Sequence, residues 1–157
     1  MDEMNRSRGR VLALSVSERT GTPKANVPKV RLVEDWGIDG DAHAGKWHRQ
    51  VSLLAMESIA RMRALGVDVG PGAFAENITT ESLEVPNLRI GDRIIIGEAE
   101  LEVTQIGKEC HAGCAIFEQV GECVMPKEGV FARVLRGGAI AVGDAIEVLP
   151  AASAVSL

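Results

Sequence analysis

Three cysteines lie close together in the second half of this chain of 157 residues, and they are its only cysteines. They are Cys110, Cys114 and Cys123. A thiolate is a strong nucleophile and a soft metal ligand, so a cluster of three predicts nucleophilic or metal chemistry. His111 stands between the first two, and the positive charge of Lys108 favours a thiolate nearby. The candidate catalytic residues are therefore Cys110, His111 and Cys114.

The spacing of these cysteines leaves several kinds of site open. Cys110 and Cys114 are four apart, which separates them by about 6 Å on one face of a helix and about 13 Å in a strand. Because a disulfide needs Cα atoms within about 7 Å, a bridge between them requires a helix or a turn. A structural zinc site would use the three cysteines and a histidine, but the usual second close pair is missing. Cys123, beside Val124 and Met125, also fits a buried cysteine that packs as a small hydrophobic residue.

A second polar segment, residues 37–49, combines glycines with charged residues and a tryptophan. Its glycines allow the backbone to approach a ligand closely, and its basic side chains suit an anion. A surface loop with solvated charges is the alternative interpretation. The candidate ligand-binding residues of this segment are Asp41, His43, Lys46, His48 and Arg49.

A third segment, residues 71–81, begins with a Pro-Gly turn and leads into an Ile-Thr-Thr strand. Asn77 stands just before that strand, where its amide can bind a ligand or cap a turn. A local hydrogen bond between its side chain and the backbone is the alternative, and physical chemistry alone favours it. Arg133 and Arg136 are further candidate contacts for an anion, from a distant part of the sequence.

Composition limits the classes of partner. The net charge of −5 argues against a nucleic-acid partner, because phosphate binding needs a basic face. No apolar run approaches the roughly 20 residues that span a bilayer, and the charged first residues are not a secretory signal. The odd number of cysteines then favours a reducing cytoplasm, where cysteines serve catalysis or metal binding more often than disulfides.

Short apolar runs separated by turns predict a mainly β fold, of the β-rich α+β class. We expect one sheet, closed or nearly closed into a β-barrel, with a few short helices. Its strands are predicted at residues 11–16, 29–33, 93–96, 101–106 and 145–149, with a short buried strand at 51–54. The runs at 93–96 and 101–106 flank a short turn at Gly97-Glu-Ala and predict a β-hairpin.

One helix is predicted over residues 57–66, because Ile59, Met62 and Leu65 recur at spacing three and Gly66 can end the helix. At 157 residues the chain suits a single domain, residues 1–157, with its core at about 9–149 and flexible ends. Aromatic residues make up only 3% of the chain, so Val, Ile, Leu and Ala must form most of the core.

Five motifs carry a family resemblance. In chain order they are Asp39-Gly-Asp-Ala-His-Ala-Gly, His48-Arg-Gln-Val-Ser-Leu-Leu, Pro71-Gly-Ala-Phe-Ala-Glu-Asn-Ile-Thr-Thr, Ile90-Gly-Asp and Cys110-His-Ala-Gly-Cys. Together they resemble a stand-alone MOSC domain, the C-terminal domain of molybdenum cofactor sulfurase that also occurs in the amidoxime-reducing component. Residues 121–138 resemble a small bacterial subgroup, and the resemblance covers residues 9–149.

The resemblance implies a β-barrel that binds molybdenum cofactor or carries sulfur for it. The characteristic cysteine of the family matches Cys114, which implies a molybdenum ligand or sulfur carrier there and an assisting thiol at Cys110. Ala112 and Gly113 stand where the amidoxime-reducing relatives have Ser and Arg. Those relatives also carry an extra N-terminal β-barrel, so their reductase activity is not carried over to this chain.

The implied cofactor is the molybdenum cofactor, and no covalently bound pyridoxal phosphate is expected. Its implied contacts are Asp41, His43, Lys46, His48, Arg49, Asn77 and Arg133, with Cys114 as the metal ligand. The implied partners are proteins of molybdenum cofactor biosynthesis or molybdoenzymes, with a redox partner for any turnover, and neither nucleic acid nor membrane. The alternatives are a non-catalytic module that delivers the cofactor and a Cys/His structural metal-binding domain.

Overall fold

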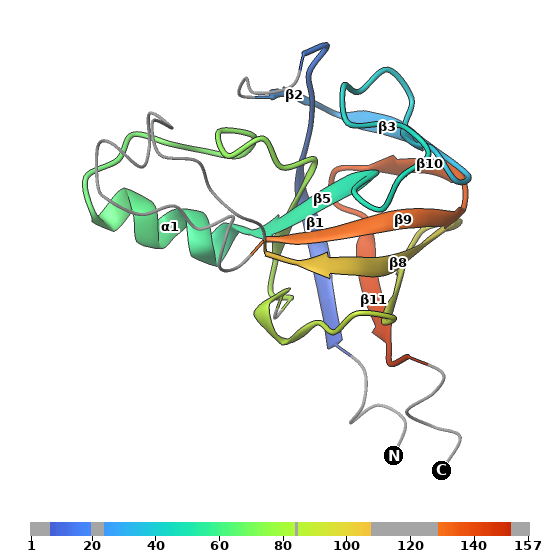
Figure 1. The fold of residues 1–157 in the computed structure, drawn as a ribbon. Coiled ribbons are helices and arrows are strands. Elements are labelled where there is room, and N and C mark those ends of the chain that lie inside the picture. Colours follow the sequence, from blue (N-terminus) through green and yellow to red (C-terminus); the bar gives the residue numbers. More distant parts are fainter. Residues whose placement is uncertain (1–6, 20–23, 84, 108–128, 152–157) are drawn as a thin grey trace.

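Seven of the described strands close into a β-barrel, which confirms the predicted architecture (Figure 1). The computed structural model describes residues 7–19, 24–83, 85–107 and 129–151. Around the barrel the order is β11 (Ala145–Leu149), β7 (Arg93–Ile96), β8 (Ala99–Ile106), β9 (Val130–Arg136), β5 (Val51–Ala55), β6 (Ile78–Glu81) and β1 (Ser7–Val16). Pairing of β1 with β11 closes the sheet.

Neighbouring strands of the barrel pair antiparallel, except for β5 and β6. These two are parallel because a crossover containing α1 (Met56–Ala64) connects them. The predicted hairpin of β7 and β8 is present, with Arg93 opposite Glu102 and Ile96 opposite Ala99. β2 (Ala25–Val27) extends the sheet beside β1, and η2 (Val85–Asn87) is a short 3-10 helix between β6 and β7.

The prediction that residues 29–33 belong to the closed sheet is wrong. They form β3 (Lys29–Val33), which lies in a second, three-stranded sheet with β10 (Gly138–Ala141) and β4 (Gly37–Ile38). The chain passes from β9 into β10 after one residue, so β10 leaves the barrel and presents its own edge to β3. The same alternation suits either sheet, because it fixes only which face of a strand is buried.

That burial does follow the predicted alternation. Val30 and Leu32 are buried in the same apolar cluster as the barrel interior, whereas Lys29 and Arg31 are exposed. The small sheet therefore covers part of the barrel core, and Figure 1 shows it beside β9.

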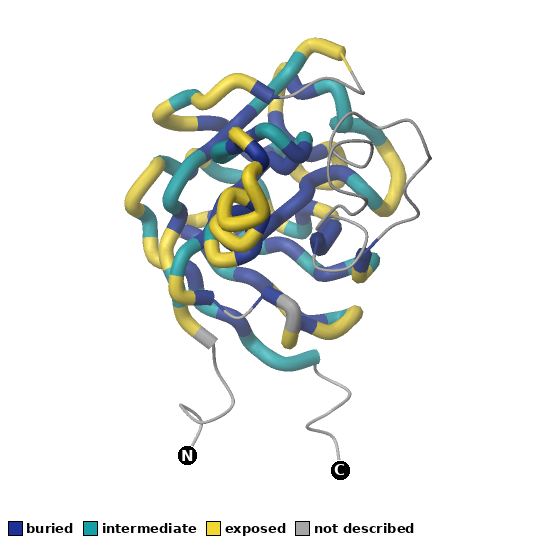
Figure 2. Tube along the Cα trace, turned by 90° about the vertical axis from the view of Figure 1, so that its left-hand side faces the viewer, coloured by how far each residue is buried: buried dark blue, intermediate teal, exposed yellow. Residues whose placement is uncertain are grey.

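The barrel interior is packed with aliphatic side chains, as the scarcity of aromatic residues predicts. Its central members are fully buried, and most of the trace through the strands is correspondingly dark in Figure 2. They include Leu14, Ile38, Leu53, Ile78, Ile94, Ile96, Leu101, Val103, Val130, Val134 and Ile146. No described residue of this cluster is aromatic, and the buried charged residues that the structure describes, Lys24, Asp41, Glu76 and Asp92, all lie outside the strands.

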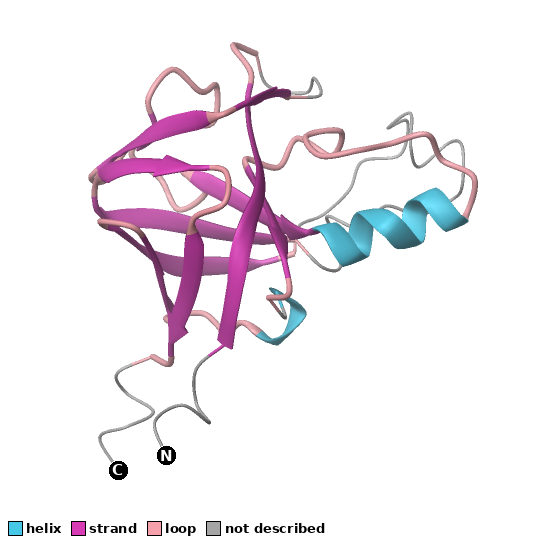
Figure 3. Ribbon diagram, turned by 180° about the vertical axis from the view of Figure 1, so that it is seen from behind, coloured by secondary structure: helices cyan, strands magenta, loops and turns pink. Residues whose placement is uncertain are grey.

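A second apolar cluster lies outside the barrel, under α1. Ile59 and Met62 are buried there with Leu54 and Phe131, so these two helical positions are confirmed. Figure 3 shows α1 projecting from the end of the barrel. The third predicted position, Leu65, is 55% exposed because it caps the helix beyond its last turn. Among the described helices, none is long and apolar enough to span a membrane.

Truncation of Leu101 tests the packing of the barrel. Leu101 is fully buried in the interior, so Leu101→Ala should lower the free energy of unfolding by about 2–5 kcal/mol through lost contacts and a residual cavity. Urea unfolding measures the change. The matched control is Leu65→Ala on the helix cap, where the change should stay within about 0.5 kcal/mol. Equal losses in the two variants would contradict the assigned core.

Candidate ligand-binding site

The loop of residues 39–49 joins β4 to β5 and is built from successive turns. The N–H of Ala44 donates to the carbonyl of Asp41, and the N–H of Gly45 donates to the carbonyl of Trp36. Gly40 has a φ of +85°, in the left-handed region that glycine adopts without strain. The loop thus folds back on the β3–β4 turn instead of extending into solvent, which brings its histidines and cations toward the outside of the barrel.

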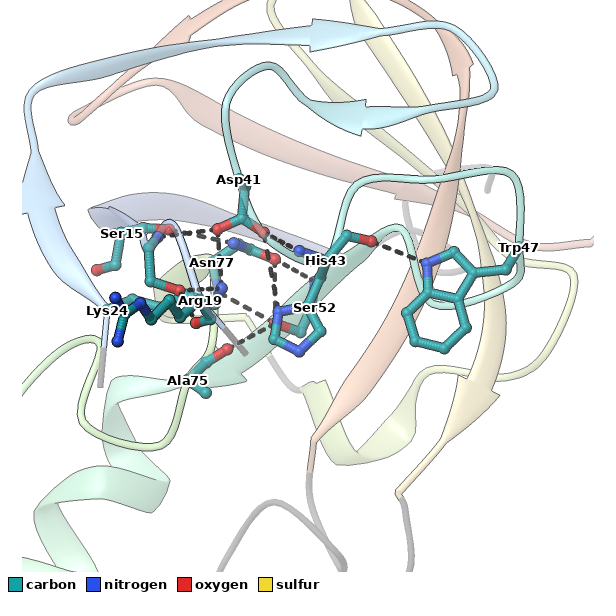
Figure 4. A network of polar contacts seen from close by, with 10 residues as sticks. Ser15, Arg19, Lys24, Asp41, His43, Trp47, Ser52, Ala75 and Asn77 are labelled. Atoms are coloured by element: carbon teal, nitrogen blue, oxygen red, sulfur yellow. Dashed lines mark hydrogen bonds and ion pairs between the residues drawn. The ribbon is translucent and has the colours of Figure 1, made fainter. Parts of the chain in front are cut away.

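A buried ion pair holds this loop to the strands beneath it (Figure 4). The Lys24 Nζ lies 2.8 Å from the Asp41 Oδ1, and both side chains are fully buried. The same Oδ1 accepts the N–H of Ser17, and Oδ2 accepts the N–H of His43. Asp41, a predicted cofactor contact, is therefore committed to positioning His43 and tying the loop to the end of β1.

Two opposing effects set the pKa of Asp41. Burial by itself raises this pKa, but the hydrogen bond and charge of Lys24 lower it. The N–H groups of Ser17 and His43 lower it further, and the net result lies below the ordinary value of 3.8. The carboxylate is thus charged at neutral pH, and its charge stabilises the folded state there.

Asn77 is also buried next to the barrel, and its side chain binds the backbone of Ser52 in β5 and Ser15 in β1. Its Oδ1 accepts the N–H of Ser52 at 3.0 Å, and its Nδ2 donates to the carbonyl of Ser15 at 3.1 Å. The side chain is completely buried and joins β5, β6 and β1 (Figure 4). The sequence predicted a side-chain-to-backbone hydrogen bond to a neighbouring residue. The bonds observed are of this type, but their partners are distant in sequence.

Glu76, beside Asn77, is the second buried carboxyl group. Burial raises its pKa, although the N–H groups of Gly72 and Phe74 and the hydroxyl of Thr79 oppose that shift. These hydrogen bonds fix the 71–76 loop against β6. The sequence did not single out this role, because a glutamate before a strand looks the same whether it faces solvent or the loop.

Three predicted ligand contacts come together in an open groove of about 510 Å³ on the outer face of β8 and β9. Lys46 and His48 enter it from the loop, and Arg133 enters from β9. Its full lining is Asp35, Lys46, Trp47, His48, Ile90, Gly91, Glu102, Val103, Thr104 and Arg133. Arg133 also pairs with Glu102 at 2.9 Å, which fixes its direction.

Arg49 lies beside this groove and not in its lining. Its guanidinium carbon is 5.3 Å from the centroid of the Trp47 ring and 5.5 Å from that of Phe131. These are cation–π distances, so Arg49 joins the loop to the aromatic residue at the start of β9. Its Nε is buried and has no hydrogen-bond partner among the described residues. Arg136 points elsewhere, to the carbonyl of Glu98.

The loop also contacts the strand end that leads toward the cysteines. The His48 Nε2 lies 2.8 Å from the Gln105 Oε1, and the Gln105 Nε2 donates to the carbonyl of Gly107. The N–H of Gly107 donates to the carbonyl of Gly129 at 2.7 Å. Gly107 and Gly129, the described residues on either side of residues 108–128, therefore lie side by side, and Gly107 is two hydrogen bonds from His48.

The cysteine run itself lies outside the described residues. This applies to Cys110, His111, Cys114 and Cys123, so their predicted roles remain predictions. Sequence reasoning also overlooked three residues of the site that the structure does describe: Lys24, Trp47 and Gln105. Only Trp47 had a usable signal, because a tryptophan in a loop is unusual in a chain with so few aromatic residues.

The buried ion pair predicts a pH-dependent stability difference. Lys24→Met leaves Asp41 buried without its partner, which should cost about 3–5 kcal/mol at neutral pH. The wild-type contribution is present above pH 3.8 and is lost as the pH falls through the lowered pKa of Asp41. In the variant, Asp41 takes up a proton at higher pH. The gap in unfolding free energy between the two proteins should therefore narrow as the pH falls.

Two further proteins complete that measurement by thermal and urea unfolding. Replacement of both partners, in Lys24→Met/Asp41→Leu, should restore most of the lost stability because no charge stays buried alone. Arg93→Met breaks an ion pair with Glu100 in which the Arg93 side chain is 47% exposed, and should cost at most about 1 kcal/mol. A Lys24→Met protein as stable as Arg93→Met would contradict the assignment.

Comparison with known proteins identifies relatives of this fold. A family model described as the MOSC domain matches residues 40–147. The YUAD protein from Bacillus subtilis is similar in structure, with a TM-score of 0.76 and 20% identity over 91% of this chain and 96% of that chain. YiiM from Escherichia coli gives a TM-score of 0.63 and 22% identity over 89% of this chain and 69% of that chain.

No curated protein sequence matches the chain. The solved structures support the fold, and the family model covers residues 40–49 of the loop and the strands from β5 to the first three residues of β11. MOSC domains are associated with the molybdenum cofactor, which indicates a role related to that cofactor. This chain belongs to the MOSC domain family.

Proposed function

We propose that this protein binds molybdenum cofactor, or carries sulfur for it, through the thiolate of Cys114. The family membership supports the cofactor, and the motif match in the sequence supports this cysteine. A thiolate is the ligand type that a soft metal or a transferable sulfur requires. Cys110 is proposed as the assisting thiol and Cys123 as a structural residue.

The observation that carries the proposal is the hydrogen-bonded link between the loop and the base of the cysteine segment. His48 bonds to Gln105, and Gln105 bonds to Gly107, the last described residue before the segment. The groove, which His48 lines, therefore lies close to Gly107. The proposed role of Cys114 requires this proximity, because histidines and cations assist a thiolate only when they are near it.

The donor set of the described site fits an anionic cofactor. Lys46 and Arg133 offer hydrogen-bond donors that can face a phosphate, and Lys46 has no ion-pair partner within the described part of the chain. The bound group would supply a molybdenum centre for a thiolate to ligate. The protein would contribute orientation through the loop, since the Lys24–Asp41 pair fixes the backbone at His43.

Partners follow from the same proposal. A cofactor carrier needs proteins of molybdenum cofactor biosynthesis to load it or molybdoenzymes to receive its cargo. An enzyme would also need a redox partner, because the sequence carries no flavin, haem or iron–sulfur signature of its own. Turnover separates the two cases, since a carrier binds one equivalent and stops.

Three separate variants, Cys110→Ser, Cys114→Ser and Cys123→Ser, test the assignment. Each is purified under reducing conditions from a molybdenum-replete host, and its molybdenum and persulfide are measured by elemental analysis and mass spectrometry. We expect Cys114→Ser to lose at least about tenfold of the bound species, because the ligand or carrier atom is removed, and Cys123→Ser to match the wild type.

Folding of all three variants is checked by circular dichroism, so that a loss of ligand is not a loss of structure. Retention of the bound species in Cys114→Ser would remove this residue from the mechanism. Equal losses in Cys114→Ser and Cys123→Ser, with the fold intact, would instead support the three-cysteine metal site that the spacing left open.

A further inference from the structure

We propose that the groove on β8 and β9 binds a flat, fused-ring heterocycle bearing an anionic group, with the ring stacked on Trp47. The inference rests on the proposed function, because the pterin of the molybdenum cofactor is such a ring. It adds the binding mode and a specificity-determining residue that the family match does not assign. Trp47 lines the groove and is 41% exposed.

Both tryptophans of this chain are exposed, and Trp47 is the one that lines the groove. The sequence contains two tryptophans, three phenylalanines and no tyrosine. Phe74 and Phe131, the phenylalanines that the structure describes, are each only 5% exposed. Leaving part of an indole in water forfeits about 25 cal/mol for each Å² of apolar surface, so an exposed position indicates a surface kept free for contact.

The indole of Trp47 is held in place although it is exposed. Its Nε1 donates to the carbonyl of His43 at 2.8 Å. The His48 ring meets it edge-on at a centroid separation of 5.8 Å, and the Arg49 guanidinium lies over the ring at 5.3 Å. A ring fixed at three points loses little entropy when a ligand binds, which is what a stacking platform requires.

The rest of the groove suits a flat anion. Ile90, which is 65% exposed, supplies apolar surface to the same lining as the indole. Lys46 and Arg133 supply hydrogen-bond donors along the same groove. The volume of about 510 Å³ lies within the range of small-molecule sites, roughly 300–1,000 Å³.

Of the two acidic residues of the lining, only Asp35 keeps its charge without an ion-pair partner among the described residues. Glu102 is paired with Arg133, and Asp35 accepts a hydrogen bond from Gln50. Lys46 has no such partner within the described residues, so its charge is available to a ligand. The groove combines a fixed indole, the exposed side chain of Ile90 and the cation of Lys46. We therefore expect it to prefer a flat ring with an acidic substituent to a ligand that has only the ring or only the acid.

Trp36 provides a matched control. It is 43% exposed, close to the value for Trp47, and lies on the neighbouring turn, where its carbonyl accepts the N–H of Gly45. It does not line the groove. Trp36→Leu and Trp47→Leu each remove an exposed indole from this region. Only Trp47→Leu removes the ring that lines the groove.

The experiment titrates the wild type and both variants with pterin-6-carboxylate by isothermal titration calorimetry. Cyclohexanecarboxylate, an anion with no flat ring, and inorganic phosphate are the comparison probes. We expect the wild type and Trp36→Leu to bind pterin-6-carboxylate alike and more tightly than either comparison probe. Trp47→Leu should bind it about 10-fold more weakly, since stacking contributes about 1–3 kcal/mol for each ring. Trp47→Phe, which keeps a flat ring, should bind with an intermediate affinity.

Three outcomes would overturn the proposal. In the first, the wild type binds no pterin-6-carboxylate; in the second, Trp36→Leu and Trp47→Leu lose the same affinity for it; in the third, the wild type binds cyclohexanecarboxylate as tightly as pterin-6-carboxylate. Thermal unfolding confirms that each variant is folded. Because the probe contains no metal, its affinity reports on the stacking site, whereas the molybdenum and persulfide content of Cys114→Ser reports on the thiolate. A failure of the thiolate assignment and a failure of the stacking site therefore give different results.

Discussion

Closure of the barrel between β1 and β11 is the constraint on which the rest of the structure depends. Once the sheet closes, aliphatic side chains fill its interior, and the buried charged residues that the structure describes, Lys24, Asp41, Glu76 and Asp92, lie in the connections between strands. Every polar residue with a chemical role must then lie on the outer face or in a connection. The groove at Lys46, His48 and Arg133 lies on that outer face, over β8 and β9.

Connections outside the barrel need their own means of fixation, because they lack a strand ladder. The loop of residues 39–49 obtains it from a small polar core, in which the buried pair of Lys24 and Asp41 is central. Hydrogen bonds from Asp41 reach the backbone of Ser17 and His43, and Trp47 then bonds to the carbonyl of His43. Burial of one ion pair thus determines where an exposed ring lies several residues away.

Local pattern predicted much of the fold but not its long-range pairing. Alternation in residues 93–96 and 101–106 predicted a hairpin, and that hairpin is present. Residues 29–33 alternate equally well, yet they pair with β10 in a separate sheet. Alternation states which face of a strand is buried and carries no information about its neighbour, so the barrel was predictable and the second sheet was not.

The site shows the same division. Residue type and crowding in one loop identified Lys46, His48 and Arg49, and the structure places Lys46 and His48 in a groove with Arg133. Asp41 was chosen for the same reason, but its neighbours are Lys24 and two backbone N–H groups. Lys24 itself was not foreseen, since only the fold determines whether a lysine is solvated or paired with a buried carboxylate.

The central claim is that the loop of residues 39–49 and the cysteine run form one site. A nitroxide label on Cys114, in a protein carrying Cys110→Ser and Cys123→Ser, tests it through paramagnetic broadening of amide resonances. The account predicts strong broadening at His48 and Trp47 and a sharp resonance at Gly97, which lies beyond the opposite end of β8 from Gly107. Sharp resonances at His48 and Trp47 would contradict the account.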